Sequence, residues 1–215
     1  MKKTISIVQA TLTVLYVSAL LIANIITAKQ MVLPFGMTMT CAIFIFPVTY
    51  ILSDVFSEVY GYKWSRFTCY LAFSMNLVMV LFFQLAIATE APAYWTDQAA
   101  FETVLGNTPR ILAASLLAYV LGDLANDKVF RRMKQRRKGT EGFAARAILS
   151  SLVGEMVDSA IFIPLAFIGQ MPTETMLIMA ATQVCLKVGY EIVIVPITTA
   201  VAKKLARLEG VTANG

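Results

Sequence analysis

Two residues of opposite charge stand near the middle of long apolar segments. Asp158 lies in the segment 147–168, and Lys187 lies in the segment 175–202. A charge at the centre of a membrane-spanning helix costs about 2.5–3.5 kcal/mol on insertion scales, so such residues are functional candidates. Because the two charges stand at similar depth on consecutive segments, we expect them to form an ion pair.

Further polar and aromatic residues share a helical face with one of these two charges, because they lie three, four or seven residues apart along the segment. They are Glu155 and Phe162 on the first segment, and Gln183, Tyr190 and Glu191 on the second. Turned toward each other, the two faces would form a polar cavity with aromatic walls, which is the usual form of a small-molecule site. Asn76, at about the same depth in another segment, and Asn24, in the outer part of the first, could add amide groups.

A second group of acids lies nearer the predicted cytoplasmic ends of two other segments. Asp54, Glu58 and Asp123 could carry protons or gate a transport route, or they could form interfacial ion pairs with nearby basic residues. Both readings stay open. The similar pentapeptides at 50–54 (YILSD) and 119–123 (YVLGD) suggest a parallel repeat.

The deeper positions hold more acids than bases. Lys187 is the base, and the acids are Asp54, Asp123, Glu155, Asp158 and Glu191. Buried carboxylates need compensation, so this excess indicates that protons, or a ligand rich in hydrogen-bond donors, complete the site. A carboxylate accepts two parallel N–H bonds well, which suits a guanidine- or guanine-like edge.

The composition excludes an ordinary soluble enzyme. Of the 215 residues, 58% are hydrophobic and 14% are charged, against roughly half and about a quarter in soluble domains. The absence of histidine excludes His-based triads, His proton shuttles and His-ligated metals. The three cysteines lie far apart and no phosphate-binding GxxxxGK[ST] loop occurs, so we expect no metal, no cofactor and no ATP hydrolysis by this chain alone.

Six apolar runs are long enough to cross a bilayer, which takes about 20 residues each. They predict a single all-α domain over residues 1–215, a bundle of six transmembrane helices at about 5–28, 37–60, 67–89, 111–130, 147–168 and 175–202. The first run follows Lys2 and Lys3 as a signal peptide would. Its length and the lack of an A-x-A site predict an uncleaved first span.

The basic residues predict the orientation of these spans. Fifteen of the 18 lysines and arginines fall on one side, and Lys29 and Arg110 fall on the other. Because cytoplasmic loops are enriched in Lys and Arg, both termini are expected in the cytoplasm. The same enrichment favours a topology anchor over an RNA or anionic-lipid site for the basic run at 128–138.

The connection from 90 to 110 is the longest one expected outside. Phe101, Val104 and Leu105 recur at helical spacing, which predicts a short interfacial helix, either a lid over the site or a plain surface segment. Thr108 and Pro109 are a typical helix start, with Thr108 as the cap.

Several motifs, taken together, resemble the bacterial queuosine precursor transporter family, also called the vitamin uptake transporter group. The resemblance covers nearly the whole chain, in order and at plausible spacing. Its motifs are PxTYxxSDxxxEVYG at 47–61, NTPR at 107–110, VDSxxF at 157–162 with AF at 166–167, and KxxYE at 187–191 with Pro196.

The resemblance implies a six-helix inner-membrane protein that imports a 7-deazaguanine precursor of the tRNA base queuosine. The cargoes it implies are 7-cyano-7-deazaguanine and 7-aminomethyl-7-deazaguanine, with queuine in some relatives. Asp158 would accept the ring N–H groups. Lys187 would either neutralise Asp158 in the empty site or donate a hydrogen bond to a ring oxygen. The family more usually has glutamine where this chain has Glu155, so an extra carboxylate here could change the choice of cargo.

Two other classes of function remain open. A small six-helix protein could be the substrate-binding subunit of an energy-coupling-factor transporter, and Ala19 and Ala23 could then pack against this scaffold with its ATPase module. A homodimer is also possible. An intramembrane enzyme could use Glu155 and Asp158 as an acid/base pair, although no nucleophile with an adjacent base is evident. The partners expected are a deazapurine cargo and the lipid bilayer, with no nucleic acid.

Overall fold

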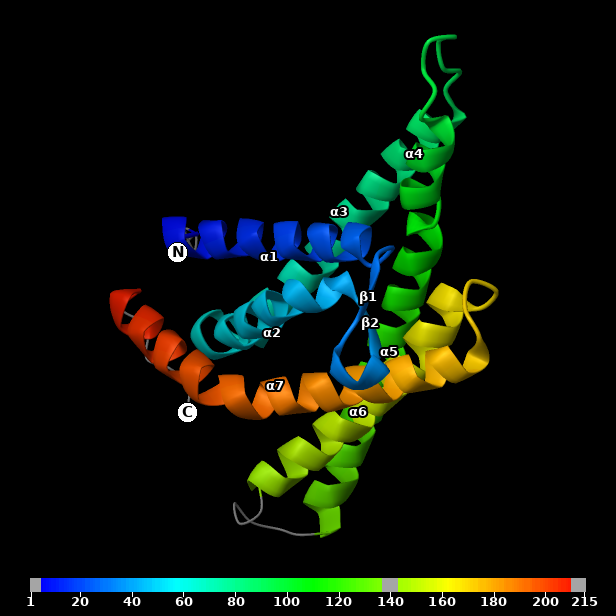
Figure 1. Ribbon diagram of the computed structural model, residues 1–215. Coiled ribbons are helices and arrows are strands. Elements are labelled where there is room, and N and C mark those ends of the chain that lie inside the picture. The colour runs from blue at the N-terminus through cyan, green and yellow to red at the C-terminus, as the bar shows by residue number, and fades with distance from the viewer. Residues whose placement is uncertain (1–4, 137–142, 210–215) are drawn as a thin grey trace. The chain divides into compact units, whose positions relative to one another are not determined.

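The computed structural model describes residues 5–136 and 143–209 of the chain (Figure 1). The predictions that involve Lys2, Lys3, Arg137 and Lys138 therefore lie outside the described residues. The side chain of Glu191 also lies outside what the structure describes.

The described chain is almost entirely helical, which confirms the expected all-α class. The long helices are α1 (Ile7–Ile26), α3 (Tyr62–Ala88), α5 (Thr108–Arg136), α6 (Phe143–Phe167) and α7 (Thr173–Leu208). Shorter elements connect them: β1 (Gln30–Val32), η1 (Pro34–Gly36), β2 (Thr38–Thr40), η2 (Cys41–Phe44), α2 (Phe46–Val55), η3 (Phe56–Tyr60) and α4 (Gln98–Leu105).

Among the described residues, five helical stretches are long and apolar enough to cross a membrane: Ile7–Ile26, Tyr62–Ala88, Gln98–Asn126, Leu149–Phe167 and Thr173–Ile194. Each contains or overlaps one of the six predicted spans. The remaining prediction, a continuous helix over 37–60, is wrong. That segment instead forms a strand, a 3₁₀ turn, the ten-residue helix α2 and the π-helical turn η3.

A proline and a glycine set the two ends of the helical part of the 37–60 segment. Pro47 lies in the first turn of α2, where its missing N–H costs nothing, but it cannot continue a helix from the preceding turn. At the other end, Gly61 has φ of +84°, a conformation that ends η3 and lets the chain turn into α3. Pro47 therefore limits the helix to the later part of the apolar run, and Gly61 ends it.

The chain divides into two compact units. Unit 1 comprises residues 1–30, 40–109 and 191–215, and unit 2 comprises residues 31–39 and 110–190. The single domain over 1–215 stays a prediction.

Unit 1 has two apolar clusters that share the α2–η3 segment. In one, Tyr16 of α1 meets Phe56 edge-on, with ring centroids 5.9 Å apart, and both pack with Leu52 and Ala72. In the other, the buried residues are Val55, Val59, Ala202 and Ala206. The broken second segment is thus held between α1, α3 and the end of α7.

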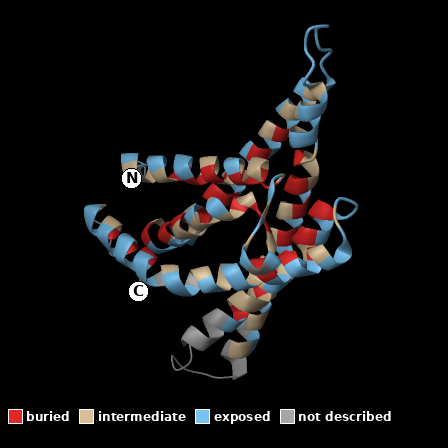
Figure 2. Cartoon of the chain, viewed as in Figure 1, coloured by how far each residue is buried: buried red, intermediate tan, exposed pale blue. Residues whose placement is uncertain are grey.

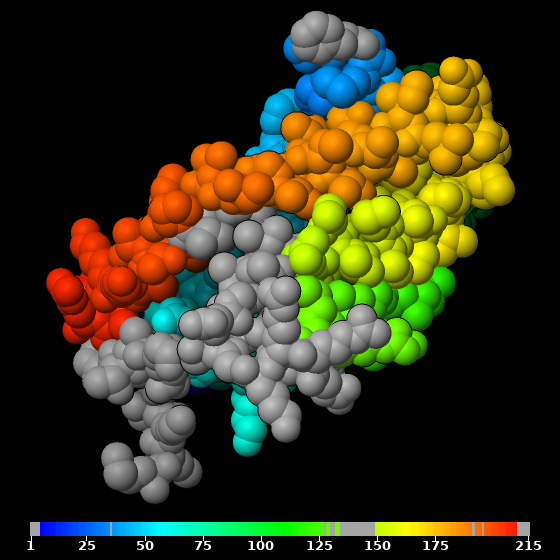
Figure 3. Space-filling view, turned by 90° about the horizontal axis from the view of Figure 1, so that it is seen from below, coloured from blue at the N-terminus to red at the C-terminus, as the bar shows by residue number. Residues whose placement is uncertain are grey.

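Unit 2 is built on α5, α6 and the first part of α7, which share one apolar core. Its buried residues are Ile111, Ala114 and Ala118 of α5, Phe162, Ile163, Ala166 and Phe167 of α6, and Met176 and Met179 of α7. In the space-filling view, the yellow part of α6 lies between the green of α5 and the orange of α7 (Figure 3).

The helices bury narrow stripes and leave large apolar side chains exposed. Figure 2 shows the buried residues as stripes along helices that are otherwise exposed or half-buried. On α3, for example, Ala72 and Asn76 are buried, whereas Leu77, Leu81 and Leu85 are 53–63% exposed. Exposed leucines at helical spacing are costly in water and favourable in lipid, so these faces fit contact with acyl chains.

Candidate functional site

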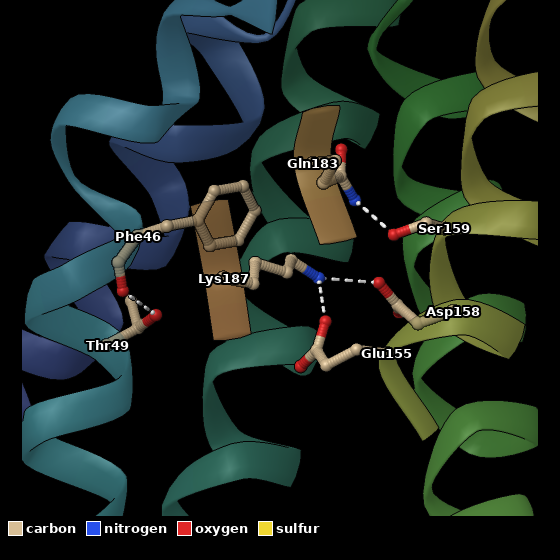
Figure 4. Close-up of polar contacts among 7 residues, drawn as sticks. All are labelled: Phe46, Thr49, Glu155, Asp158, Ser159, Gln183 and Lys187. Atoms are coloured by element: carbon tan, nitrogen blue, oxygen red, sulfur yellow. Dashed lines mark hydrogen bonds and ion pairs between the residues drawn. The ribbon is translucent and has the colours of Figure 1, made fainter. Parts of the chain in front are cut away.

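Unit 2 holds a cluster of three charges, which we call the charged cluster: Lys187, Asp158 and Glu155. The Lys187 ammonium lies 2.7 Å from Asp158 Oδ2 and 2.7 Å from Glu155 Oε2 (Figure 4). The Lys187 side chain is 9% exposed, that of Glu155 19% and that of Asp158 24%. The ion pair expected from the sequence is therefore present, and Glu155 shares the same cation.

A hydrogen-bonded pair lies one helical turn from the charged cluster. The Gln183 amide donates to the Ser159 hydroxyl at 3.2 Å (Figure 4). One turn along α7, from Gln183 to Lys187, corresponds to one turn back along α6, from Ser159 to Glu155. Because α6 and α7 are antiparallel, Gln183 meets Ser159, and one turn further along α7 Lys187 meets Glu155.

Phe162, predicted to line the cavity, is part of the apolar core of unit 2. It is 6% exposed and meets Phe167 edge-to-face, with centroids 6.1 Å apart and ring planes at 88°. The Phe162 ring is therefore occupied by packing and is not free to contact a ligand. The other aromatic candidate is Tyr190, which lies three residues after Lys187 on α7 and is half-buried.

Two glycines bring α5 and α6 into close contact beside the charged cluster. A Cβ atom at Gly122 would lie 3.0 Å from the Gly154 carbonyl oxygen and 3.2 Å from Asp158 Cβ. A Cβ at Gly154 would lie 3.0 Å from Asn126 Cβ and 3.1 Å from the Gly122 carbonyl oxygen. These distances leave almost no room for a methyl group, so both glycines are part of what positions Asp158.

Asn24 and Asn76 form a buried pair in unit 1. The Asn24 amide donates to the Asn76 side-chain oxygen, and the Asn76 amide donates to the Ala72 carbonyl at 2.9 Å. Asn24 is 4% exposed and Asn76 is fully buried. The structure thus uses these amides to join α1 to α3, and their contact with a cargo stays a prediction.

The second group of acids is distributed over both units. Asp54, in the last turn of α2, and Glu58, in η3, are exposed in unit 1, whereas Asp123, on α5 beside Gly122, is half-buried in unit 2. The π-helical geometry at Glu58 is of a kind that often occurs at functional sites. The similar pentapeptides lie in different surroundings, because α2 ends at Val55 and α5 continues to Arg136.

The 90–110 connection contains the predicted short helix, α4, and α5 starts at Thr108 as expected. The Thr108 hydroxyl donates to the Leu105 carbonyl at 2.6 Å, which joins the start of α5 to the end of α4. The role of α4 as a lid stays a prediction.

The helices α6 and α7 continue through Pro164 and Pro196. Ala19 and Ala23, expected to pack against a second protein, are 3% and 0% exposed, so their surface is already used within the chain.

The residues that the sequence analysis missed are the small ones and the polar partners: Gly122, Gly154 and Ser159, together with Arg110 at the start of α5. Gly154 lies one turn before Asp158, and Ser159 directly follows it. Small residues on a charge-bearing helix favour close contact with a neighbouring helix. That pattern could have indicated Gly154 and Ser159 as residues of the site.

The charged cluster can exchange partners without isolating a charge. Removing the sole partner of a buried ion is strongly unfavourable. Because Lys187 contacts two carboxylates, one of them can turn to a ligand while the other keeps the ammonium paired. Such an arrangement suits reversible binding of a molecule that offers hydrogen-bond donors.

Comparisons with known proteins agree with this picture. Residues 40–201 match the family described as "putative vitamin uptake transporter". A curated relative in Bacillus subtilis (strain 168), named "Probable queuosine precursor transporter", is 27% identical over 183 residues, which cover 85% of this chain and 79% of the relative. No solved structure matches the chain significantly. With three-quarters of its length matched and with helices long and apolar enough to cross a membrane, the chain belongs to the vitamin uptake transporter family of multi-pass membrane proteins.

Proposed function

We propose that this protein imports queuosine precursors, 7-cyano-7-deazaguanine and/or 7-aminomethyl-7-deazaguanine, as a facilitator or secondary transporter. Membership of a transporter family supports the transport role, and the name of the Bacillus subtilis relative supports the cargo class. The observation that carries the proposal is the charged cluster, in which two carboxylates share one ammonium between membrane-length helices.

In this proposal Asp158 receives the cargo. A deazaguanine ring presents adjacent N–H groups on one edge, and a carboxylate matches two parallel donors. As Asp158 turns to the ring, Glu155 keeps Lys187 paired, and on release Lys187 returns to Asp158. The ammonium therefore replaces the cargo in the empty site, which lowers the cost of leaving a carboxylate buried.

The neighbouring groups complete recognition. Gln183 lies one turn from Lys187 and can exchange its bond to Ser159 for the ring edge. Tyr190 is the aromatic of α7 available for stacking, and Glu191, Asn76 and Asn24 remain candidates for contact. We assign proton or gating roles to Asp54, Glu58 and Asp123.

We also propose a location in the bacterial inner (cytoplasmic) membrane with both termini in the cytoplasm. The distribution of lysines and arginines over the connections supports this orientation.

Uptake into proteoliposomes that contain this chain alone tests the proposal. We expect a labelled precursor to enter, an unlabelled precursor to compete with it, and guanine to compete much more weakly. Entry without a second protein would also decide against the alternative of a binding subunit that needs an ATPase module. Lack of entry for both precursors, in vesicles shown to hold folded protein, would contradict the proposal.

A further inference from the structure

Arg110, one of two basic residues on the predicted external side, binds the carboxy-terminal end of α6. Its Nε–H donates to the Leu165 carbonyl at 2.6 Å, and its Nη2 donates to the Ile168 carbonyl at 2.8 Å. Both bonds cross from the first turn of α5 to the end of α6. The last carbonyls of a helix lack partners within that helix and carry partial negative charge, so a guanidinium is a well-matched partner there.

The end of α6 needs support from outside the helix. Pro164 lies one turn before Ile168 and has no N–H, so the helical bond that it would donate is missing from the last turns of α6. The following turn is short, because α6 ends at Phe167 and α7 begins at Thr173, with Gly169 at φ of +83° between them. Fixing the Ile168 carbonyl therefore also fixes where α7 starts.

The position of the charged cluster depends on how α5, α6 and α7 are aligned along their lengths. Asp158 lies seven residues before Leu165, about 10 Å along α6. On α5, the residues that face α6 recur every three or four positions from the Arg110 end inward: Ile111, Ala114, Ala118 and Gly122. One contact stripe thus begins at the Arg110 bonds and ends where Gly122 meets Asp158.

We propose that Arg110 is a positioning residue for the cargo site. Through the two carbonyls at the end of α6, it holds the α6–α7 hairpin in the register that keeps Lys187 between Asp158 and Glu155. The predicted effect of Arg110 on precursor uptake rests on the proposed function, whereas its predicted effect on the alignment of the helices does not.

The test uses the full-length protein with two readouts. In a background with the three natural cysteines replaced by serine, the pair Ser159→Cys and Gln183→Cys reports the α6–α7 register through its rate of cross-linking by a short bis-methanethiosulfonate reagent, which spans the gap left by the shorter cysteine side chain at 183. Precursor uptake by the protein without this pair gives KM and Vmax. The variants are Arg110→Gln, Arg110→Lys and, as a matched control, Arg66→Gln, whose guanidinium bonds to Tyr62 within α3.

We expect the cross-linking rate of Arg110→Gln to fall about threefold and its KM to rise about fivefold with Vmax retained, because a charged helix-terminal contact is lost. Arg110→Lys keeps the charge but lacks the planar guanidinium that makes two bonds at once. We therefore expect its cross-linking rate and its KM to lie between those of Arg110→Gln and the parent. We expect Arg66→Gln to match the parent in both quantities. If Arg110→Gln does not accumulate in the membrane, a slower cross-link in Arg110→Lys supports the proposal and an unchanged one overturns it.

An unchanged cross-linking rate in Arg110→Gln overturns the proposal even if KM rises, since Arg110 would then act by another route. A slower rate with unchanged KM overturns the link to the cargo site. If the parent protein imports neither precursor, the proposed function fails, and the cross-linking rate still decides whether Arg110 sets the register.

Discussion

At the residue scale, the ammonium of Lys187 is the group on which the account depends. It contacts two carboxylates at the same distance, 2.7 Å, and neither acid is fully buried. This sharing explains how a charge can persist between apolar helices and still be available for exchange.

We expect Asp158→Asn to lower precursor uptake at least about tenfold, the equivalent of about 1.4 kcal/mol. The amide keeps the size of the side chain but loses the second acceptor oxygen and the charge, while Glu155 still holds Lys187. Uptake is measured at equal protein in the membrane, with Asp97→Asn, at an exposed position in the 90–110 connection, as the matched control. Near-normal uptake by Asp158→Asn would remove Asp158 from the mechanism.

The buried asparagine pair predicts coupled stability. Asn76→Ala deprives the Asn24 amide of its acceptor, which we expect to cost about 0.5–2 kcal/mol of stability. Thermal unfolding in detergent should show that the double variant with Asn24→Ala loses less than the two single losses added together. Strictly additive losses would mean that the pair contributes nothing as a pair.

At the element scale, the crossing of α5 over α6 positions the acids. We expect Gly122→Ala or Gly154→Ala to impair uptake severalfold, because the added methyl group meets backbone or Cβ atoms at 3.0–3.2 Å. Gly189→Ala on α7 is the matched control, since a Cβ there meets nothing within 4 Å. Equal uptake by all three variants would show that this crossing tolerates separation.

The long helices could be predicted from the sequence, because an apolar run that crosses lipid must satisfy its own backbone and a helix does so locally. The break in 37–60 depended on Pro47, which is visible in the sequence, but the apolar count outweighed it. The approach of Asp158 to Lys187 could be predicted, because the two charges stand near the middle of consecutive apolar runs.

Apart from the pair of Lys187 with Asp158, the partners of the polar groups could not be predicted in this way. Whether Lys187 meets one acid or two depends on the register between helices, and that depends on contacts far apart in the sequence, such as Gly122 with Gly154 and Arg110 with Ile168. Phe162 shows the same limit, since its helical face alone did not distinguish a cavity wall from a packed core.

At the scale of the whole molecule, exposed leucines and the placement of basic residues predict a fixed orientation in the membrane. A fluorescent protein fused to the carboxy-terminus should fluoresce, and alkaline phosphatase fused there should be inactive. Phosphatase inserted at Tyr94, in the connection between α3 and α4, should be active. The reverse pattern would place the 90–110 connection in the cytoplasm and contradict an entry route from outside.

The most direct test of the proposed function is the queuosine content of tRNA in a host that lacks both precursor synthesis and its own transporter. The host expresses this protein and receives each precursor separately at low concentration. We predict that at least one precursor restores queuosine with the native protein and restores far less with Asp158→Asn. No restoration by either precursor, with the native protein present in the membrane, would contradict it.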